Sequence, residues 1–275
     1  MKPLFEINFL MPIITLTTDW GHKDHYLAGV KGCLLKAIPD ANIIDISHDI
    51  PPFDVYQASF ILKSSYRNFP ANTIHILGVN SESSIETPHI VLRYDNQYFI
   101  GADNGIFSLM FVENPSKIIE LNIIQDSDKF TFSTKDVFVK VAQHITDGKN
   151  IEDLGFIKKS LNKLMSFEPV IENNENGGLT IIGKVIYIDR YENAIVNISR
   201  ELFEKTGKRK NFSISFNSFS NIVTKISKSY GDVSISDMVA IFDSNDYMEL
   251  SINQGNAGSL MGLKIDTKVR VTFDA

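Results

Sequence analysis

The sequence predicts an α/β protein of two domains: a parallel sheet covered by helices, then a smaller, barrel-like domain of antiparallel strands. The chain has 275 residues, which is close to the length of two domains of about 150 residues each. Its first half alternates short β-branched runs with segments of helical periodicity, the pattern typical of a parallel sheet. Its second half contains short strands at turn-like spacing, which is typical of a small antiparallel domain.

The first five predicted elements follow the order strand, helix, strand, helix, strand. Residues 13–17 are β-branched and end in a polar turn, which indicates a buried strand, and Tyr26 begins a segment of helical spacing. Pro39 and Pro70 end the two predicted helices because proline cannot continue a helix. This alternation is Rossmann-like. The strands are predicted at 13–17, 42–46 and 73–79, and the helices at 26–38 and 53–69.

A hairpin and two more helices complete the first half. Asp95-Asn96 separates two apolar runs and predicts a tight turn between antiparallel strands. Asp103-Asn104-Gly105 introduces a short helix, and another helix follows further along the chain. The hairpin strands are predicted at 89–94 and 97–102, and the helices at 106–112 and 134–147.

A polar, glycine-ended and aperiodic segment at 172–178 marks the predicted domain boundary. We therefore predict an α/β domain at 11–170, a linker at 171–178 and a β domain at 179–275. One short helix, at 200–206, interrupts the β domain. Its strands are predicted at 179–189, 194–198, 212–216, 238–242, 248–252 and 269–273.

The composition excludes several classes of protein. The net charge is −6, with 27 Lys and Arg against 33 Asp and Glu, whereas a nucleic-acid scaffold carries a basic surface. Cys33 is the single cysteine, which excludes an internal disulfide framework and a cysteine-rich zinc site. No run of about 18 apolar residues is present. We expect a cytoplasmic enzyme or small-molecule binder with neither a membrane nor a nucleic acid as partner.

Residues 1–10 lack the long apolar stretch and the small-residue cleavage site of a signal peptide. We interpret them either as an extension from an upstream start or as a short ordered arm.

Polar side chains cluster after each of the first three predicted strands. Ligands of open α/β sheets bind beyond the carboxyl ends of the strands, so three such clusters together favour a site. Taken singly, each residue favours a structural role, because Asp and Ser are common in turns and helix caps. The clusters are Thr17, Thr18, Asp19 and Asp24, then Ser47, His48 and Asp49, then Asn80, Ser81, Glu82, Ser83 and Ser84.

Several common motifs are missing. The phosphate loops G-x-G-x-x-G and G-x-x-x-x-G-K-[ST] and the nucleophile elbow G-x-S-x-G do not occur. His22 and His25 have weak metal-ligand spacing, and we predict no metal. We expect His75, inside a predicted strand, to be packed and hydrogen-bonded, and His48 to orient a loop rather than react.

Five sequence blocks, in order and across both predicted domains, resemble one enzyme family. Together they span nearly the whole chain from residue 13, and as a set they are highly specific. The blocks are I-T-L-T-T-D-W-G at 14–21 with V-K-G at 30–32, D-I-S-H at 45–48 with I-P-P-F-D at 50–54, G-A-D-N-G at 101–105, Y-I-D-R-Y-E-N at 187–193 and N-Q-G-N-A at 253–257. They are similar to motifs of the S-adenosyl-L-methionine hydroxide adenosyltransferases, whose relatives are the fluorinases and chlorinases.

This resemblance implies a fold, an assembly and a reaction. The implied fold is an N-terminal α/β domain with a C-terminal β domain. The implied assembly is a homotrimer that binds substrate between the N-terminal domain of one subunit and the C-terminal domain of its neighbour. The implied reaction is attack at the ribose C5′ of S-adenosyl-L-methionine, which releases methionine and, when water attacks, adenosine. S-adenosyl-L-methionine is then the substrate, and no further cofactor is implied.

The resemblance also implies roles for individual residues. Asp19 accepts both ribose hydroxyls, and Phe53, at the position of a family tryptophan, packs against the sugar or the sulfonium side chain. Asn104, in the G-A-D-N-G block, is a further substrate-binding candidate. The methionine ammonium and carboxylate fall to Asp24, Asp189 and Ser244, and the adenine edge falls to Asn193, Asn256 and Ala257.

The chain departs from the family at the nucleophile. Hydroxide-using members carry Asp, Arg and His there, and on an ungapped alignment Asn80, Thr87 and Ser133 replace all three. None of these is a base at neutral pH. Asn80, Ser83 and Thr134 are candidates to cradle water or a halide, and Glu82 and His89 are candidates for the missing base. The chain lacks the fluorinase insertion near the hairpin, which favours water as nucleophile.

Two other functions stay open. The first is an S-adenosyl-L-methionine or adenosine binder that has lost catalysis, because all three water-positioning residues are replaced. The second is adenosyl transfer to a halide or another small nucleophile. A methyltransferase is disfavoured because no glycine-rich loop follows the first strand.

Overall fold

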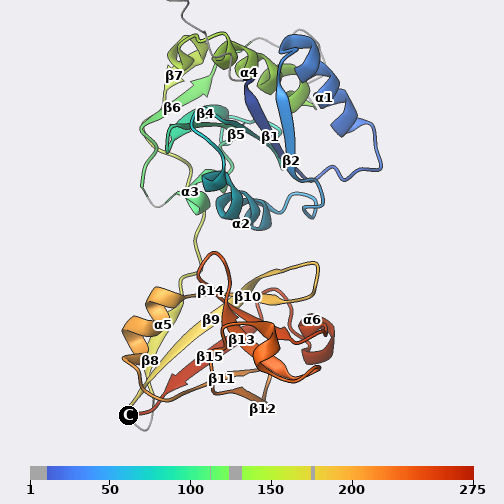
Figure 1. Ribbon diagram of the computed structural model, residues 1–275. Coiled ribbons are helices and arrows are strands. Elements are labelled where there is room, and N and C mark those ends of the chain that lie inside the picture. The colour runs from blue at the N-terminus through green and yellow to red at the C-terminus, as the bar shows by residue number, and fades with distance from the viewer. Residues whose placement is uncertain (1–10, 112, 124–131, 175–176) are drawn as a thin grey trace, which may run out of the picture. The chain divides into compact units, whose positions relative to one another are not determined.

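The computed structural model describes residues 11–111, 113–123, 132–174 and 177–275, which fall into two units, Met1–Met165 and Ser166–Ala275 (Figure 1). Residues 1–10, which we interpret as an extension or as a short arm, lie outside the described residues. Each unit has its own sheet and its own buried apolar cluster. Among the described helices, none has the length and apolarity that a membrane crossing requires.

The first unit is built on a mixed sheet with the strand order β2-β1-β3-β5-β4-β6-β7. β1 runs parallel to both β2 and β3, and β3 runs parallel to β5. The hairpin of β4 and β5 is antiparallel, as predicted, and β6 and β7 extend that edge. The strands are β1 Ile13–Thr18, β2 Asn42–Ser47, β3 Ile74–Gly78, β4 His89–Tyr94, β5 Gln97–Ala102, β6 Lys117–Leu121 and β7 Gly155–Ile157.

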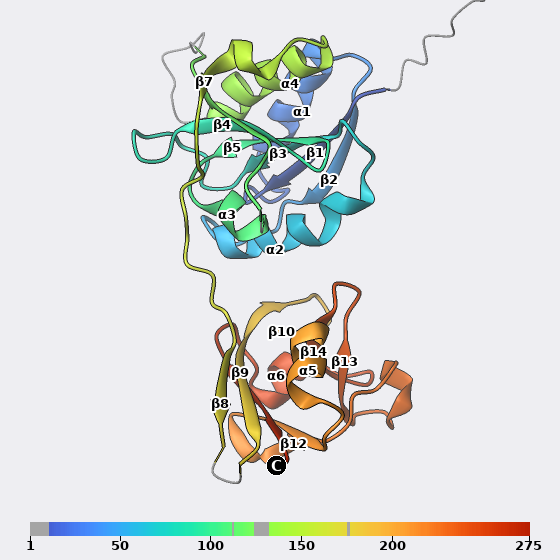
Figure 2. The same ribbon diagram turned by 90° about the vertical axis from the view of Figure 1, so that its left-hand side faces the viewer.

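Helices cover both faces of this sheet, which confirms the predicted α/β class (Figures 1 and 2). α1 (Tyr26–Ala37) and α4 (Val139–Thr146) pack on one face, with Ile14 and Leu16 of β1 beneath them. α2 (Val55–Ser65) and α3 (Ile106–Met110) pack on the other. The helix predicted at 134–147 begins instead as a π-helical turn, Thr134–Phe138, and such turns are frequent at functional sites. Short 3₁₀ turns follow at Tyr66–Asn68 and Ile151–Leu154.

His75, the second residue of β3, is packed and hydrogen-bonded, as predicted. Its Nδ1 lies 2.7 Å from Thr15 Oγ1 and its Nε2 lies 2.6 Å from Gln97 Oε1. Gln97 in turn donates its Nε2–H to the Phe69 carbonyl, so Oε1 is an acceptor and the neutral ring carries its proton on Nε2. Burial lowers the pKa of His75 to about 4.

This pKa predicts a loss of stability in mild acid. Below about pH 6.5 the unfolded chain binds a proton at His75, whereas the folded chain does not until about pH 4. The free energy of unfolding therefore falls by up to about 3 kcal/mol through this window as the pH is lowered. Urea titrations between about pH 7 and pH 5 measure the slope, and His75→Gln should remove most of this component. Equal slopes in both proteins would contradict the assignment.

The second unit is an antiparallel, nearly closed barrel with the strand order β12-β11-β15-β9-β10-β14-β13, and β8 pairs with β9. Ile226, just after β12, bridges to Ala240 of β13, and the Ser227 N–H donates to the Ala240 carbonyl at 2.8 Å, which brings the two ends of the sheet together. This confirms the predicted barrel-like domain. The strands are β8 Val170–Asn173, β9 Leu179–Ile188, β10 Ala194–Ser199, β11 Phe212–Phe216, β12 Ser218–Val223, β13 Met238–Phe242, β14 Tyr247–Ile252 and β15 Lys268–Phe273.

The helix predicted in the second unit is α5 (Arg200–Gly207), capped by Ser199, whose side chain accepts from the Leu202 N–H. A second helix, α6 (Ala257–Met261), and the strands β8 and β12 were not predicted. The two units divide between Met165 and Ser166, and Val170–Asn173 pairs with β9. Part of the segment expected as a linker at 171–178 is therefore a strand.

Candidate functional site

The sheet of the first unit has a topological switch point between β1 and β3. The chain leaves β1 toward β2 on one side and returns to β3 on the other, so the crossovers diverge there. Crevices outside the carboxyl ends of strands at such a point are the usual ligand sites of open α/β sheets. The predicted polar clusters after β1 and β3 lie at this edge.

Asp19 follows β1 and is fixed by the loop that precedes α2. Its Oδ2 accepts the Phe53 N–H at 2.9 Å, so the structure brings together these two predicted site residues. Phe53 has a φ of +67°, an unusual conformation for an aromatic residue, and its side chain is 71% exposed. Such strain clusters at functional sites. Asp24, further along the Asp19 loop, is exposed.

Asn104 stabilises the loop after β3 through hydrogen bonds to its backbone. Its Nδ2 donates to the Val79 carbonyl at 3.3 Å and to the Asn80 carbonyl at 3.0 Å, while its Oδ1 accepts the Ile106 N–H at the start of α3. Asn80 itself has a φ of +45°, which asparagine tolerates better than most residues. Asn104 therefore acts on the Asn80 backbone in this structure.

Two hydroxyls from distant parts of the chain meet beside this loop. Ser81 Oγ lies 3.3 Å from Thr134 Oγ1, and Thr134 is fully buried at the start of the π-helical turn. Ser83, a candidate with Asn80 and Thr134 for cradling the nucleophile, is exposed, and the hydroxyl that contacts Thr134 is that of Ser81. Ser133 is buried next to Thr134.

His89, at the start of β4, supports the same loop. Its Nε2 lies 2.9 Å from the Ser81 carbonyl oxygen, which can only accept, so Nε2 carries the proton and Nδ1 keeps a lone pair when the ring is neutral. Burial lowers the pKa of His89, so the ring is neutral at pH 7. Glu82, the other candidate base, is exposed.

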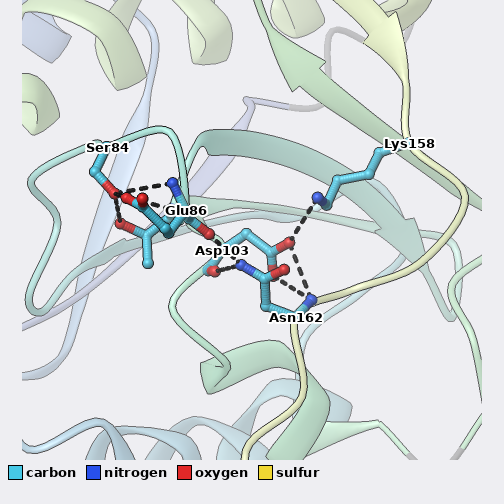
Figure 3. Close-up of polar contacts among 6 residues, drawn as sticks. Ser84, Glu86, Asp103, Lys158 and Asn162 are labelled. Atoms are coloured by element: carbon cyan, nitrogen blue, oxygen red, sulfur yellow. Dashed lines mark hydrogen bonds and ion pairs between the residues drawn. The ribbon is translucent and has the colours of Figure 1, made fainter.

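The far end of the loop is tied to the segment that follows β7 (Figure 3). Ser84 accepts the Glu86 and Thr87 N–H groups and lies 3.1 Å from the Thr87 hydroxyl. Asn162 Nδ2 donates to the Glu86 carbonyl at 2.6 Å. The structure therefore places Thr87 in a local turn.

Asp103 holds the backbone of Asn162 in place. Both of its carboxylate oxygens accept the Asn162 N–H at 3.1 Å, and Lys158 Nζ lies 3.5 Å from Oδ2 (Figure 3). Burial raises the pKa of Asp103, while the contacts with Asn162 and Lys158 oppose that shift. This clamp was not predicted from the sequence.

In the second unit, Asp189 organises the loop between β9 and β10. Its Oδ1 accepts the N–H groups of Tyr191 and Asn193, both at 2.8 Å, and its Oδ2 accepts the Asn193 side-chain amide at 3.0 Å. Asp189 and Asn193, both predicted binding residues, are therefore in direct contact.

Glu192 joins this loop to the start of α6, where Asn256 and Ala257 lie. Its carboxylate accepts the Ser259 N–H at 2.7 Å and the Asn256 side-chain amide at 3.2 Å, and its carbonyl accepts the Gly258 N–H. Two motifs that are far apart in the sequence thus form one loop cluster. Ser244 is exposed in the turn between β13 and β14.

Glu249 is a buried acid in the same unit that sequence reasoning missed. It is 4% exposed, and its Oε1 accepts hydrogen bonds from Tyr230 at 2.8 Å and from Ser251 at 2.5 Å. Burial raises its pKa, and the negative charges of Asp189 and Asp243 add to the increase. The alternation of β14 does not distinguish such an acid from a solvated one, so no sequence signal identified it.

An α/β sheet that gathers carboxylate, amide and hydroxyl groups at its switch point is the architecture of an enzyme acting on a polar small molecule. The chain belongs to the SAM hydroxide adenosyltransferase family. Residues 14–155 match the family's N-terminal domain and residues 183–270 match its C-terminal domain.

Relatives of similar length match nearly the whole chain. The (R)-S-adenosyl-L-methionine hydrolase of Methanocaldococcus jannaschii is 24% identical, with 96% of this chain and 97% of that protein covered. The fluorinase of Nocardia brasiliensis is 22% identical, with 96% and 98% covered. A solved structure, an uncharacterized conserved protein from Thermotoga maritima, is 29% identical, has a TM-score of 0.83 and covers 94% of this chain.

Proposed function

We propose that the protein is an S-adenosyl-L-methionine hydrolase. A lone pair of water forms a new C–O bond at the ribose C5′, the C–S bond breaks, and its electron pair remains on sulfur. The products are adenosine and L-methionine, and the proton lost by water passes to a base. Family membership and the hydrolases among the relatives support this assignment.

The reaction needs positioning more than acid catalysis. A sulfonium leaves as a neutral thioether, so no general acid is required, and the rate depends on holding water in line with the C–S bond. Rigid polar groups and exclusion of competing water are the means by which a protein achieves this.

The observation that carries the proposal is the fixed carboxylate of Asp19 at the switch point. One oxygen accepts the Phe53 N–H, and a carboxylate has about four acceptor positions, so Asp19 retains capacity for both ribose hydroxyls. Phe53, whose N–H binds Asp19, has an exposed ring that offers an apolar face to the sugar or the sulfonium side chain. Asp24, on the loop that carries Asp19, is proposed to bind the methionine ammonium.

The nucleophile is proposed to lie against Asn80 and the hydroxyls of Ser81 and Thr134. These groups donate and accept hydrogen bonds but do not take a proton at neutral pH. We propose His89 as the base, because its buried, neutral ring retains a basic nitrogen.

The second unit is proposed to complete the site in a homotrimer, each copy serving a neighbouring subunit, as the family resemblance implies. Its two linked loops offer amide and backbone groups for the adenine edge and an acidic group for the amino acid, and the turn between β13 and β14 offers a hydroxyl. The residues proposed there are Asn193, Asn256 and Ala257 for adenine and Asp189 and Ser244 for methionine.

Chromatography of the protein incubated with S-adenosyl-L-methionine tests the function. We expect equimolar adenosine and methionine, and Asp19→Ala should abolish both. Binding of the substrate without any turnover would instead identify an adenosyl-binding protein, and intact substrate with no binding would overturn the proposal.

A second candidate, adenosyl transfer to a halide, is favoured by the Ser81–Thr134 hydroxyl pair and by the uncharged replacements at the nucleophile. Adding chloride or fluoride to the same incubation distinguishes it. A 5′-halogenated nucleoside in place of adenosine would establish the halide as nucleophile.

A further inference from the structure

His48 makes contacts on both sides of Asp19 in the chain. Its Nδ1 lies 2.7 Å from Thr18 Oγ1, the residue before Asp19. Its backbone carbonyl accepts the Gly21 N–H at 2.7 Å, two residues after Asp19. The turn that carries the Asp19 carboxylate is therefore held at its start by a side chain and at its end by the backbone of one residue on the neighbouring loop.

The His48 imidazole is itself held in place by its neighbours. The His48 side chain is 2% exposed, and its Nε2 lies 3.1 Å from Asp45 Oδ1. The orientation of the two groups falls outside the limits of a hydrogen bond, and Nε2 makes none with any other described residue. Asp45 Oδ2 pairs with Lys31 of α1 at 2.6 Å. The His22 ring packs edge-on against His48, with centroids 5.1 Å apart.

These neighbours indicate which nitrogen carries the proton. Burial lowers the pKa of His48, so the ring is neutral and has a single N–H. The nearby carboxylate of Asp45 favours that proton on Nε2, which leaves Nδ1 to accept the Thr18 O–H. The charge on Lys31 keeps Asp45 ionised. The set therefore orients Thr18 without adding a net charge next to Asp19.

We infer that His48 is a positioning residue for the proposed ribose-binding carboxylate, acting on Asp19 through the Thr18 hydroxyl and the Gly21 backbone. The inference rests on the proposed function and names a residue on which that site's specificity for a ribose diol depends. A side chain that contacts the ligand directly is held to within less than an ångström only when a neighbouring group of this kind supports it.

The test compares two nucleosides by calorimetry, adenosine and 2′,3′-dideoxyadenosine, which lacks both hydroxyls. If Asp19 accepts the diol, the wild-type protein prefers adenosine by about 100-fold or more, and Asp19→Ala removes that preference. We expect His48→Ala and the isosteric Thr18→Val to reduce the preference to about 10-fold or less. Their affinity for the dideoxynucleoside should stay within about threefold of wild type, which also shows that the pocket has folded.

Two conservative variants separate positioning from packing. His48→Asn places an amide near the Nδ1 position and should restore most of the preference for adenosine. His48→Gln extends toward Asp45 and loses the Thr18 contact, so it should resemble His48→Ala. His144→Ala removes an imidazole on α4 whose Nε2 lies 2.8 Å from the Asn150 carbonyl oxygen, and it should change neither affinity.

The outcomes distinguish a failure of the proposed ribose site from a failure of the role assigned to His48. A wild-type protein that binds neither nucleoside, or binds both equally, contradicts the proposed ribose site itself. A wild-type preference that survives unchanged in His48→Ala and Thr18→Val overturns the role of His48. Equal losses of affinity for both nucleosides also overturn it, because they identify His48 as a general stabiliser of the fold.

Discussion

Replacing Asp19 with alanine is expected to lower the affinity for adenosine by about 100- to 10,000-fold. This variant loses the two charge-assisted hydrogen bonds that we propose between Asp19 and the ribose, each contributing about 1.5–3 kcal/mol. Asp19→Asn keeps the shape and an acceptor for the Phe53 N–H but lacks the negative charge, so it should lose about 10-fold. Isothermal titration calorimetry measures all three affinities.

Asp40→Ala is the matched control for the Asp19 series. It removes a carboxylate from an exposed position in the same unit, so it changes the net charge equally without touching the switch point. Its affinity should match wild type. Wild-type affinity in Asp19→Ala, or an equal loss in Asp40→Ala, would contradict a direct contact between Asp19 and the ribose.

Replacing His89 is expected to lower kcat by about 100-fold or more, the usual contribution of a general base, while the affinity for adenosine changes little. His89→Ala loses both the contact to the Ser81 carbonyl and the basic nitrogen. His89→Gln offers an amide N–H to that carbonyl but no base. Both should therefore bind adenosine and fail in turnover, as followed by methionine release.

The outcome for the glutamine variant decides what His89 does. Wild-type turnover in His89→Gln would contradict a role as base and leave only support of the loop. Glu82→Gln is the companion variant, since Glu82 lies in the same loop but is exposed. We expect it to retain turnover within about threefold, and a large loss there would transfer the role of base to Glu82.

The sequence predicted the strands of the first unit where β-branched residues are buried on both faces. In β1, Ile14 and Leu16 on one face and Thr15 and Thr17 on the other are fully buried, and a short run of this kind bounded by turn residues is a signal for such a strand. The position of Asp19 followed from the same signal, because the residue after such a strand lies at the ligand-binding edge of the sheet.

Elements that depend on long-range pairing were missed. β6 and β7 are short, and they form by pairing, β6 with β4 and β7 with β6. The strands β8 (V-I-E-N) and β12 (S-F-S-N-I-V) mix polar and apolar residues without a sustained alternation, so their patterns resemble loops. α6 is short and contains glycine, and its first turn is held by Glu192 from a distant loop. None of these has a local periodicity strong enough to predict.

The site also combines residues that the sequence identifies with contacts that only long-range packing creates. Asp19 stands out locally at the end of a buried strand, and Phe53 was identified through the family resemblance. The pairing of Ser81 with Thr134, by contrast, depends on where the π-helical turn is placed. Ser83 was the serine we selected in this loop as a site candidate, and the sequence does not distinguish it from the nearby Ser81, whose side chain contacts Thr134. The clamp of Asp103 on Asn162 likewise joins segments whose proximity only the folded chain reveals.

A crystal structure of the protein grown with adenosine and methionine tests the site most directly. We predict that both ribose hydroxyls lie within hydrogen-bond distance of the Asp19 carboxylate, with C5′ directed toward Ser81 and Thr134. A nucleoside whose sugar lies away from the carboxyl ends of β1 and β3 would contradict the proposed site.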